Sequence, residues 1–313
     1  MILILRKAVK SILIVFVILF TCAACFHPND NINTYDNITS QGNIIRGGTG
    51  SGYTSDGGGK QQGSMAQDTG EEKANHSELL NPRNLVNPEG RTIEERFDPP
   101  EGFTRIEAEE GSFCEYLRKL PLLPDGSPVK YFDGRTKHLN VHAAVIDMDI
   151  GTRDLQQCAD AVIRLRAEYL YSTARYDRIH FNFTNGFNAE YSKWRDGYRI
   201  AVEGNNAFWR KSAGYSNDYS TFRKYLDVVF AYAGTLSLSR EMEPIAVKDA
   251  KPGDVFIEGG SPGHSVIIVD MAVNNSTGEK VFMIAQSYMP AQNIYILIND
   301  VDKNISPWYY LNF

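Results

Sequence analysis

Apolar residues recur at helical spacing in two long stretches of the chain. The first covers residues 155–171, for which Thr152 or Asp154 could serve as the N-cap. Its apolar positions are Leu155, Ala159, Val162, Leu165 and Tyr169. The second covers residues 220–232 and should end at Gly234, because glycine readily adopts the backbone conformation that closes a helix. Both stretches are predicted to be amphipathic helices that pack one face against a core.

Continuous apolar runs replace this helical spacing towards the C-terminus. Such runs are typical of buried strands, and strands are predicted over residues 141–148, 255–258, 264–273, 280–287 and 294–298. Residues 274–278 supply turn-forming side chains between two of them. A short helix is also predicted over residues 113–120, with Ser112 as N-cap and Pro121 at its end. Together these elements predict an α+β domain.

Residues 26 to about 80 lack any such apolar periodicity. Ten of the 26 glycines fall between Gly42 and Gly70, among Asn, Ser, Thr and Gln residues. A segment of this composition cannot bury enough apolar surface to offset the entropy of ordering it. The predicted organisation is a signal peptide over residues 1–24, a flexible linker over residues 25–85 and a single domain over residues 86–313.

The first 25 residues have the order of a secretory signal. Three basic residues precede an apolar run, residues 12–20, which is too short to span about 30 Å of hydrocarbon. The Ala-Ala-Cys sequence that ends at Cys25 resembles the lipobox of bacterial lipoproteins, in which the cysteine is acylated and becomes the N-terminus. Cys22 is the alternative acceptor, and a plain signal peptide or an uncleaved anchor are the other interpretations. The sequence thus predicts a membrane-anchored lipoprotein of the cell envelope, on its periplasmic or surface side.

The charge balance argues against a nucleic-acid partner. The chain has 38 acidic and 32 basic residues and a formal charge of −6, so it offers no broad basic surface for a phosphate backbone. Loss of the predicted signal peptide, which holds three basic and no acidic residues, changes this charge to −9. We therefore expect no binding to nucleic acid.

Two cysteines besides the lipidation candidates remain, Cys114 and Cys158. Cys158 falls near the beginning of the predicted long helix, where the helix dipole would lower the thiol pKa, so we predict a nucleophile there. Gln157 and the backbone N–H of Cys158 could donate to an oxyanion. Two other interpretations stay open for Cys158: a small buried hydrophobic residue, or a disulfide with Cys114 outside the cytoplasm.

A histidine opens one of the predicted strands. His264 follows a glycine-rich loop, residues 259–263, and could act as a base towards a thiol. Two registers are possible for the predicted turn after this strand. They place either Gln286 or Ser287 diagonally across from His264, because a slip of one residue exchanges the two faces of a strand. We favour Gln286, since an amide can orient an imidazole.

This arrangement is similar to that of papain-like cell-wall cysteine hydrolases, the NlpC-like peptidases and CHAP amidases. The resemblance implies a papain-like core, in which the nucleophile helix packs on an antiparallel sheet, with Cys158 as nucleophile, His264 as base and Gln286 as orienting residue. Two features depart from these families. Gln-Cys-Ala-Asp at residues 157–160 replaces the Asp-Cys-Ser-Gly motif of NlpC-like enzymes, and the long separation of Cys158 from His264 requires an insertion over about residues 182–219.

Five short motifs also resemble a bacterial lipoprotein family named domain of unknown function 4846. They are residues 154–160 (DLQQCAD), 164–169 (RLRAEY), 232–235 (YAGT), 262–264 (PGH) and 286–292 (QSYMPAQ). The resemblance covers about residues 90–313 and implies no particular activity.

The sequence therefore predicts a lipid-anchored cysteine amidase or peptidase, with peptide or peptidoglycan-type substrates. The alternative is a non-catalytic binding or structural lipoprotein on the same fold. No cofactor and no metal are predicted, since His138 and His142 would lie about 13 Å apart on a strand without an obvious third ligand. Aromatic residues of the insertion could line a cleft or form a local core; they include Trp194, Tyr198, Phe208, Trp209 and Tyr215.

Overall fold

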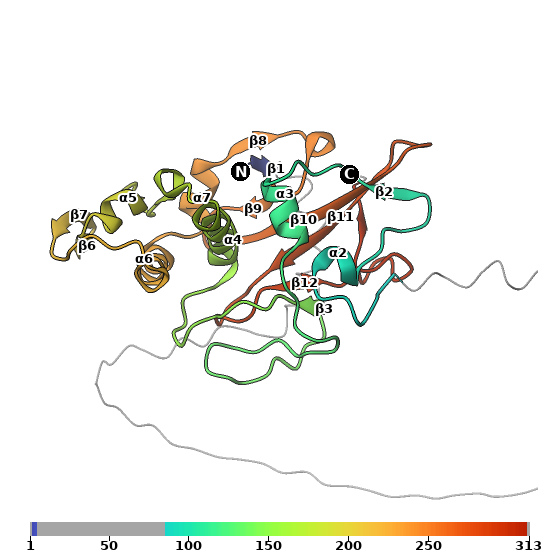
Figure 1. Ribbon diagram of the computed structural model, residues 1–313, viewed down its shortest axis with the longest axis horizontal. Coiled ribbons are helices and arrows are strands. Elements are labelled where there is room, and N and C mark those ends of the chain that lie inside the picture. The colour runs from blue at the N-terminus through green and yellow to red at the C-terminus, as the bar shows by residue number, and fades with distance from the viewer. Residues whose placement is uncertain (1, 5–84, 312–313) are drawn as a thin grey trace, which may run out of the picture. The chain divides into compact units, whose positions relative to one another are not determined.

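The computed structural model describes residues 2–4 and 85–311. Cys25, the predicted linker up to residue 84 and the predicted signal peptide beyond residue 4 lie outside the described residues. The described part contains helices and a largely antiparallel sheet, which agrees with the predicted α+β class (Figure 1). None of its helices is long and apolar enough to cross a membrane.

The central sheet of the described residues has nine strands. Along its main path the order is β3 (His142–Val145), β12 (Tyr295–Leu297), β11 (Lys280–Gln286), β10 (His264–Asn274), β9 (Val255–Glu258), β1 (Ile2–Ile4) and β8 (Glu243–Ile245). Off this path, β2 (Phe103–Arg105) pairs with β10, and β13 (Tyr309–Tyr310) pairs with β11. β1 pairs in parallel with both of its neighbours, and the other pairs in the sheet are antiparallel. Because β1 lies within the predicted signal peptide, cleavage would remove it from the sheet.

Helices pack against this sheet and beside it. The helices of the described residues are α2 (Ile93–Arg96), α3 (Phe113–Arg118), α4 (Cys158–Ser172), α5 (Tyr191–Arg195), α6 (Tyr219–Tyr232) and α7 (Thr235–Glu241). Of these, α3 and α4 contact β10, and α7 contacts β9 (Figure 1). Two hairpins form separate small sheets: β4 (His180–Asn182) with β5 (Asn188–Glu190), and β6 (Tyr198–Glu203) with β7 (Asn206–Lys211).

Most predicted elements are present, with shifts at their ends. β9 has the predicted bounds, and Ser112 caps α3 as predicted. α4 begins at Cys158, three residues later than predicted, with Gln157 as its N-cap. The Asp160 carboxylate accepts the Gln157 N–H at 3.0 Å, so this polar residue of the first turn fixes where the helix begins. Gly234, predicted to end one helix, is the N-cap of the next helix, α7.

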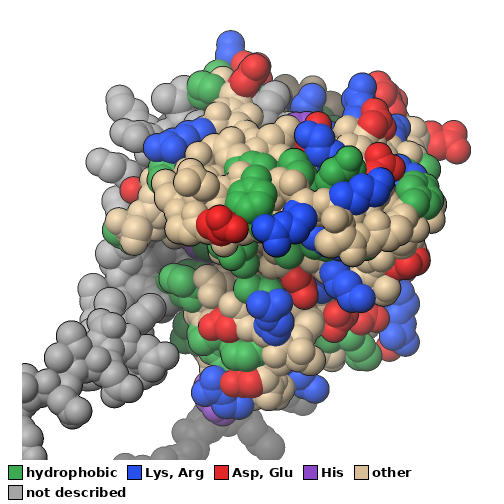
Figure 2. All heavy atoms as spheres, turned by 90° about the vertical axis from the view of Figure 1, so that its left-hand side faces the viewer, with side chains coloured by type: hydrophobic (Ala, Val, Ile, Leu, Met, Phe, Trp, Pro, Cys, Tyr) green, Lys and Arg blue, Asp and Glu red, His purple; other side chains and the backbone are tan. Residues whose placement is uncertain are grey.

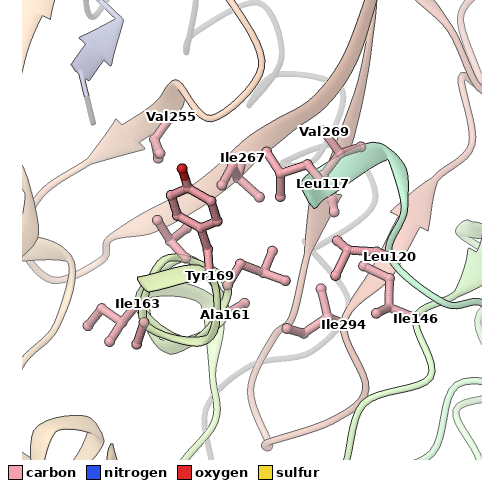
Figure 3. Packing of buried hydrophobic residues seen from close by; sticks show 14 of the residues in the cluster. Leu117, Leu120, Ile146, Ala161, Ile163, Tyr169, Val255, Ile267, Val269 and Ile294 are labelled. Atoms are coloured by element: carbon pink, nitrogen blue, oxygen red, sulfur yellow. The ribbon is translucent and has the colours of Figure 1, made fainter. Parts of the chain in front are cut away.

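Two apolar clusters fill the two faces of the sheet. The larger one lies between the sheet and the helices and includes Leu117 of α3, Ala161 and Tyr169 of α4, and Ile267 and Val269 of β10 (Figure 3). The smaller one covers the other face, and its strand members include Phe256, Val266, Ile268, Phe282 and Ile284. Burial on both faces explains why these strands appear in the sequence as continuous apolar runs.

A β-bulge in β10 decides which residues share a face at the far end of the sheet. Near the turn, Val273 of β10 pairs with Lys280 of β11, and the register then shifts just after Ile268 along β10. Ile268 pairs with Ile284. Because side chains alternate along a strand, His264 and Gln286 lie on the same face as this pair.

The predicted insertion forms α5 and the two hairpins. Trp194 is buried, packs against Tyr225 of α6 and donates its indole N–H to the Thr221 carbonyl at 3.1 Å. It therefore belongs to the larger apolar cluster. Tyr215, by contrast, is 61% exposed. Basic and acidic side chains are interspersed on the face that includes these elements, without a broad region of one sign among the described residues (Figure 2).

Candidate active site

Cys158, His264 and Gln286 come from three elements that meet at one end of the sheet. Cys158 is the first residue of α4, His264 the first of β10 and Gln286 the last of β11. Cys158 is only 8% exposed, and its sulfur accepts the backbone N–H of Ser265, the residue after His264. The thiol therefore lies against the beginning of β10.

The imidazole of His264 belongs to a chain of polar contacts. Its Nε2 lies 2.7 Å from Gln286 Oε1, and Gln286 Nε2 donates to the Tyr295 hydroxyl at 2.7 Å. Lys137 Nζ lies 3.0 Å from the same hydroxyl and 2.9 Å from Gln292 Oε1. The amide of Gln286 is thus held at both ends, with its oxygen towards the imidazole.

Ser287, the alternative to Gln286, has a different role. Its hydroxyl points to the other side of the strand, 3.0 Å from the Gln156 carbonyl oxygen and 2.9 Å from the Gln292 carbonyl oxygen. Nearby, the Ala291 N–H donates to the Asp154 carboxylate at 2.7 Å. Together these contacts fasten the turn that precedes Cys158 to the segment that follows β11.

Gln157, predicted to donate to an oxyanion, is the N-cap of α4. Its side-chain amide donates one N–H to the Asp154 carboxylate at 3.1 Å. A glutamine amide has two N–H groups, so one remains for another acceptor.

Gly263, the residue before His264, must be a glycine because neighbouring atoms lie close to its Cα. A Cβ atom at Gly263 would lie 2.2 Å from Thr235 Oγ1 and 2.4 Å from the Gly260 carbonyl oxygen. The Thr235 hydroxyl, at the beginning of α7, donates to that carbonyl at 3.2 Å. The glycine-rich loop therefore folds tightly over α7 and leads directly into His264.

Burial raises the pKa of the Cys158 thiol above its ordinary value, and the Asp160 carboxyl raises it further. The backbone N–H groups of Ala159, Ser265 and Cys158 itself have the opposite, weaker effect. The prediction that the helix N-terminus lowers this pKa is therefore wrong, because the loss of water around the sulfur outweighs the helix.

The pKa of His264 is shifted in the other direction. Burial lowers it, the hydrogen bond with Gln286 raises it to a smaller extent, and the charge of Lys137 lowers it again. With a raised thiol pKa and a lowered imidazole pKa, both groups are neutral near pH 7.

Asp160 is a second unusual group in the first turn of α4. Burial raises the pKa of its carboxyl to about 8, although the Gln157 N–H bonded to one of its oxygens acts in the opposite direction. The other oxygen, Oδ1, is buried and has no hydrogen-bond partner among the described residues. At neutral pH this carboxyl is therefore largely protonated.

Both cysteines of the described residues are free thiols, so the alternative of a disulfide between Cys114 and Cys158 does not apply to this structure. No cluster of three or more His, Cys, Asp or Glu side chains within residues 85–311 is arranged to hold a metal ion. His142 instead places its Nε2 3.1 Å from the Ser127 carbonyl oxygen.

Several neighbours of the cluster are not predicted from the sequence. Tyr288 places its ring 5.4 Å from that of His264, and Tyr295 and Lys137 complete the chain of contacts behind Gln286. Tyr288 lies within the motif of residues 286–292, so that motif could have pointed to it. For Lys137, in a polar loop more than 120 residues away from His264, the sequence carries no such signal.

These features define an α+β protein with a cysteine, a histidine and a glutamine gathered at one end of an antiparallel sheet. The chain belongs to the family described as domain of unknown function (4846), whose model matches residues 93–313. Neither the comparison with curated proteins nor the comparison with solved structures found a match.

Proposed function

We propose that this protein is a lipid-anchored cysteine hydrolase of the cell envelope, with a papain-like core that cleaves amide bonds. One observation carries the proposal: Gln286 Oε1 holds His264 Nε2 at 2.7 Å while the Cys158 sulfur lies against the backbone that follows His264. Papain-like enzymes likewise take their nucleophile from a helix N-terminus and their histidine and polar third residue from two strands.

The reaction follows from the orientation of the imidazole. A carbonyl oxygen only accepts hydrogen bonds, so His264 presents N–H at Nε2 and a lone pair at Nδ1. Nδ1 takes the thiol proton while the Cys158 sulfur attacks the amide carbon. When the tetrahedral intermediate collapses, the C–N bond breaks, and the leaving amine takes the proton from Nδ1.

The second half of the reaction returns the site to its starting state. Nδ1 of His264 takes a proton from water, whose oxygen attacks the thioester carbon. The C–S bond then breaks, the carboxylic acid leaves, and the Cys158 sulfur takes the proton back. In both halves the Cys158 backbone N–H and the remaining side-chain N–H of Gln157 would stabilise the oxyanion.

A neighbouring cavity supports a peptide as the substrate class. The cavity has a volume of about 480 Å³ and lies between α6 and residues 149–155, the loop that leads to Cys158. Its lining includes both cationic and anionic side chains: Arg153, Arg223, Lys224, Asp149 and Asp227. Such a lining complements the carboxylates and ammonium groups that peptidoglycan stem peptides carry together.

Hydrolysis of purified peptidoglycan by the full mature protein tests this proposal directly. We expect mass spectrometry to reveal newly freed amino groups in the peptide fragments, at a rate that falls to background in Cys158→Ala. In His264→Ala we expect a fall of about 10²–10⁴-fold, the usual contribution of a general base. Cys114→Ala is the matched control and should retain full activity. Equal hydrolysis by Cys158→Ala and the unmodified protein would reject the assignment of the nucleophile.

The proposed anchor has its own test. Cys25→Ala should abolish incorporation of a labelled fatty acid and move the protein from the membrane fraction to the soluble fraction. The physical reason is that acyl chains supply the apolar area which holds such a protein on a bilayer. Cys22→Ala is the control and should remain labelled; if labelling is lost there and kept in Cys25→Ala, the acceptor is Cys22.

One observation favours the second candidate, a binding or structural lipoprotein without catalysis. Cys158 is almost fully buried and its pKa is raised, which are properties of a cysteine that serves as a small core residue. Absence of hydrolysis by the unmodified protein, together with a thiol that His264 does not activate, would support this candidate.

A further inference from the structure

We propose that Lys137 is a positioning residue of the candidate site: through the Tyr295 hydroxyl it holds the Gln286 amide against His264. This inference deepens the proposed function and rests on it in one respect. The proposed reaction needs a neutral His264 imidazole that carries its proton on Nε2.

Lys137 is brought to the site by a loop that pairs with the segment following β11. Tyr131 forms an antiparallel bridge with Gln292, and the Phe132 N–H donates to the Ala291 carbonyl at 2.8 Å. The Lys137 N–H in turn donates to the Val129 carbonyl at 2.8 Å. The loop backbone is thus fixed by hydrogen bonds before the lysine and at the lysine itself.

The lysine ammonium is enclosed by groups that suit a cation. Its Nζ lies 2.9 Å from Gln292 Oε1 and 3.0 Å from the Tyr295 hydroxyl oxygen. It also lies 4.9 Å from the centre of the Tyr295 ring and 5.8 Å from that of Tyr288, distances at which aromatic faces attract a cation. A lysine that merely covered the surface would leave its ammonium in water instead.

The Tyr295 hydroxyl contacts both Lys137 and Gln286 and so links the lysine to the amide. Gln286 Nε2 donates to the Tyr295 hydroxyl at 2.7 Å, which leaves Gln286 Oε1 facing His264. If the hydroxyl moved, the amide could turn around and present an N–H to the imidazole. His264 would then carry its proton on Nδ1 and could no longer accept one from Cys158. In serine proteases, loss of the correct imidazole tautomer alone costs about 10⁴-fold in kcat.

The charge of Lys137 acts on His264 in addition. It lowers the pKa of the imidazole, as burial does. Burial also lowers the pKa of Lys137 itself, to about 8, so the lysine is mostly charged at neutral pH and loses this charge above pH 8. Other titratable groups face this site from neighbouring elements: Cys158 on α4, His142 on β3, Tyr295 on β12 and Tyr288 after β11.

Nuclear magnetic resonance of the imidazole nitrogens in the full mature protein tests the inference without any need for turnover. Loss of one signal set in His264→Gln assigns His264, and its ¹⁵N shifts then report both pKa and tautomer. In the unmodified protein we expect neutral His264 to be protonated on Nε2. In Lys137→Met we expect its pKa to rise, because a nearby positive charge is lost, and the Nδ1-protonated form to appear.

Three further variants separate the two effects of the lysine. Lys137→Arg keeps the charge and should keep the low pKa of His264. Tyr295→Phe keeps the lysine but removes the hydroxyl, so it should change the tautomer more than the pKa. Lys303→Met, at an exposed position after β12, is the matched control and should change neither.

An unchanged tautomer and pKa in Lys137→Met, in a protein whose circular dichroism and Tm show that it is folded, would overturn the inference. Failure of the proposed function gives a different result: the shifts occur as expected, but no peptidoglycan is cleaved. If both are correct, Lys137→Met lowers kcat with little change in KM, because the lysine does not touch the substrate.

Discussion

His264→Ala should slow the alkylation of Cys158 by iodoacetamide at pH 7.5 by about 100-fold or more. The reason is that burial raises the pKa of the Cys158 thiol, so little thiolate is present until the His264 imidazole removes the proton. The rate should fall continuously as the pH is lowered through the titration of His264. A preformed thiolate–imidazolium pair would instead stay reactive at low pH.

This measurement needs one thiol and one matched histidine variant. Cys114→Ser as the common background leaves Cys158 as the only cysteine of the described residues that can react. His180→Ala removes an exposed imidazole at the beginning of β4 and should leave the rate unchanged. Slow alkylation that is the same in both histidine variants would show that His264 does not activate the thiol, and the enzymatic proposal would then fail with it.

Asp160→Asn should stabilise the protein at pH 8 by up to roughly 5 kcal/mol and leave its stability at pH 4 nearly unchanged. Burial raises the pKa of this carboxyl from 3.8 to about 8 in the folded chain. Between these two pH values the folded protein holds a proton that the unfolded chain has lost. Stability therefore falls as the pH rises from about 4 to about 8 in the unmodified protein, because ionisation puts a charge into an apolar site.

Asparagine removes this dependence because it cannot ionise, while its carbonyl oxygen can still accept the Gln157 N–H. Thermal unfolding followed by circular dichroism should give a Tm at pH 8 that is higher by roughly 10 °C in Asp160→Asn. Asp177→Asn, at an exposed site, is the control and should show the pH dependence of the unmodified protein. A variant that is equally destabilised at both pH values would mean that the carboxyl acts only as a helix cap.

The same substitution connects stability to the site. The Asp160 carboxyl raises the pKa of Cys158, which lies two residues before it in the first turn of α4. Removing the acid should therefore make the thiol easier to ionise. Strongly shifted pKa values such as that of Asp160 cluster at functional sites in proteins.

Elements that depend on local pattern could be predicted from the sequence. The bounds of β9 and the cap of α3 at Ser112 both follow from residue order. These features depend on backbone periodicity and on hydrogen bonds between residues a few positions apart, which the sequence displays directly.

Only the tertiary structure decided between Gln286 and Ser287. The two residues are neighbours on β11, and the pairing of that strand with β10 contains a register shift that no turn signal reveals. Such choices need the positions of both partners in space.

The ionisation of the site also depended on the tertiary structure alone. From the sequence, the position of Cys158 at a helix N-terminus predicts a lowered pKa, whereas burial raises it, because the amount of water around the sulfur is set by segments distant in the chain. Lys137 reaches the site in the same way, through a loop that pairs with the residues after β11. Residue order shows which side chains are available for chemistry, but their solvation and charges arise only when distant segments pack together.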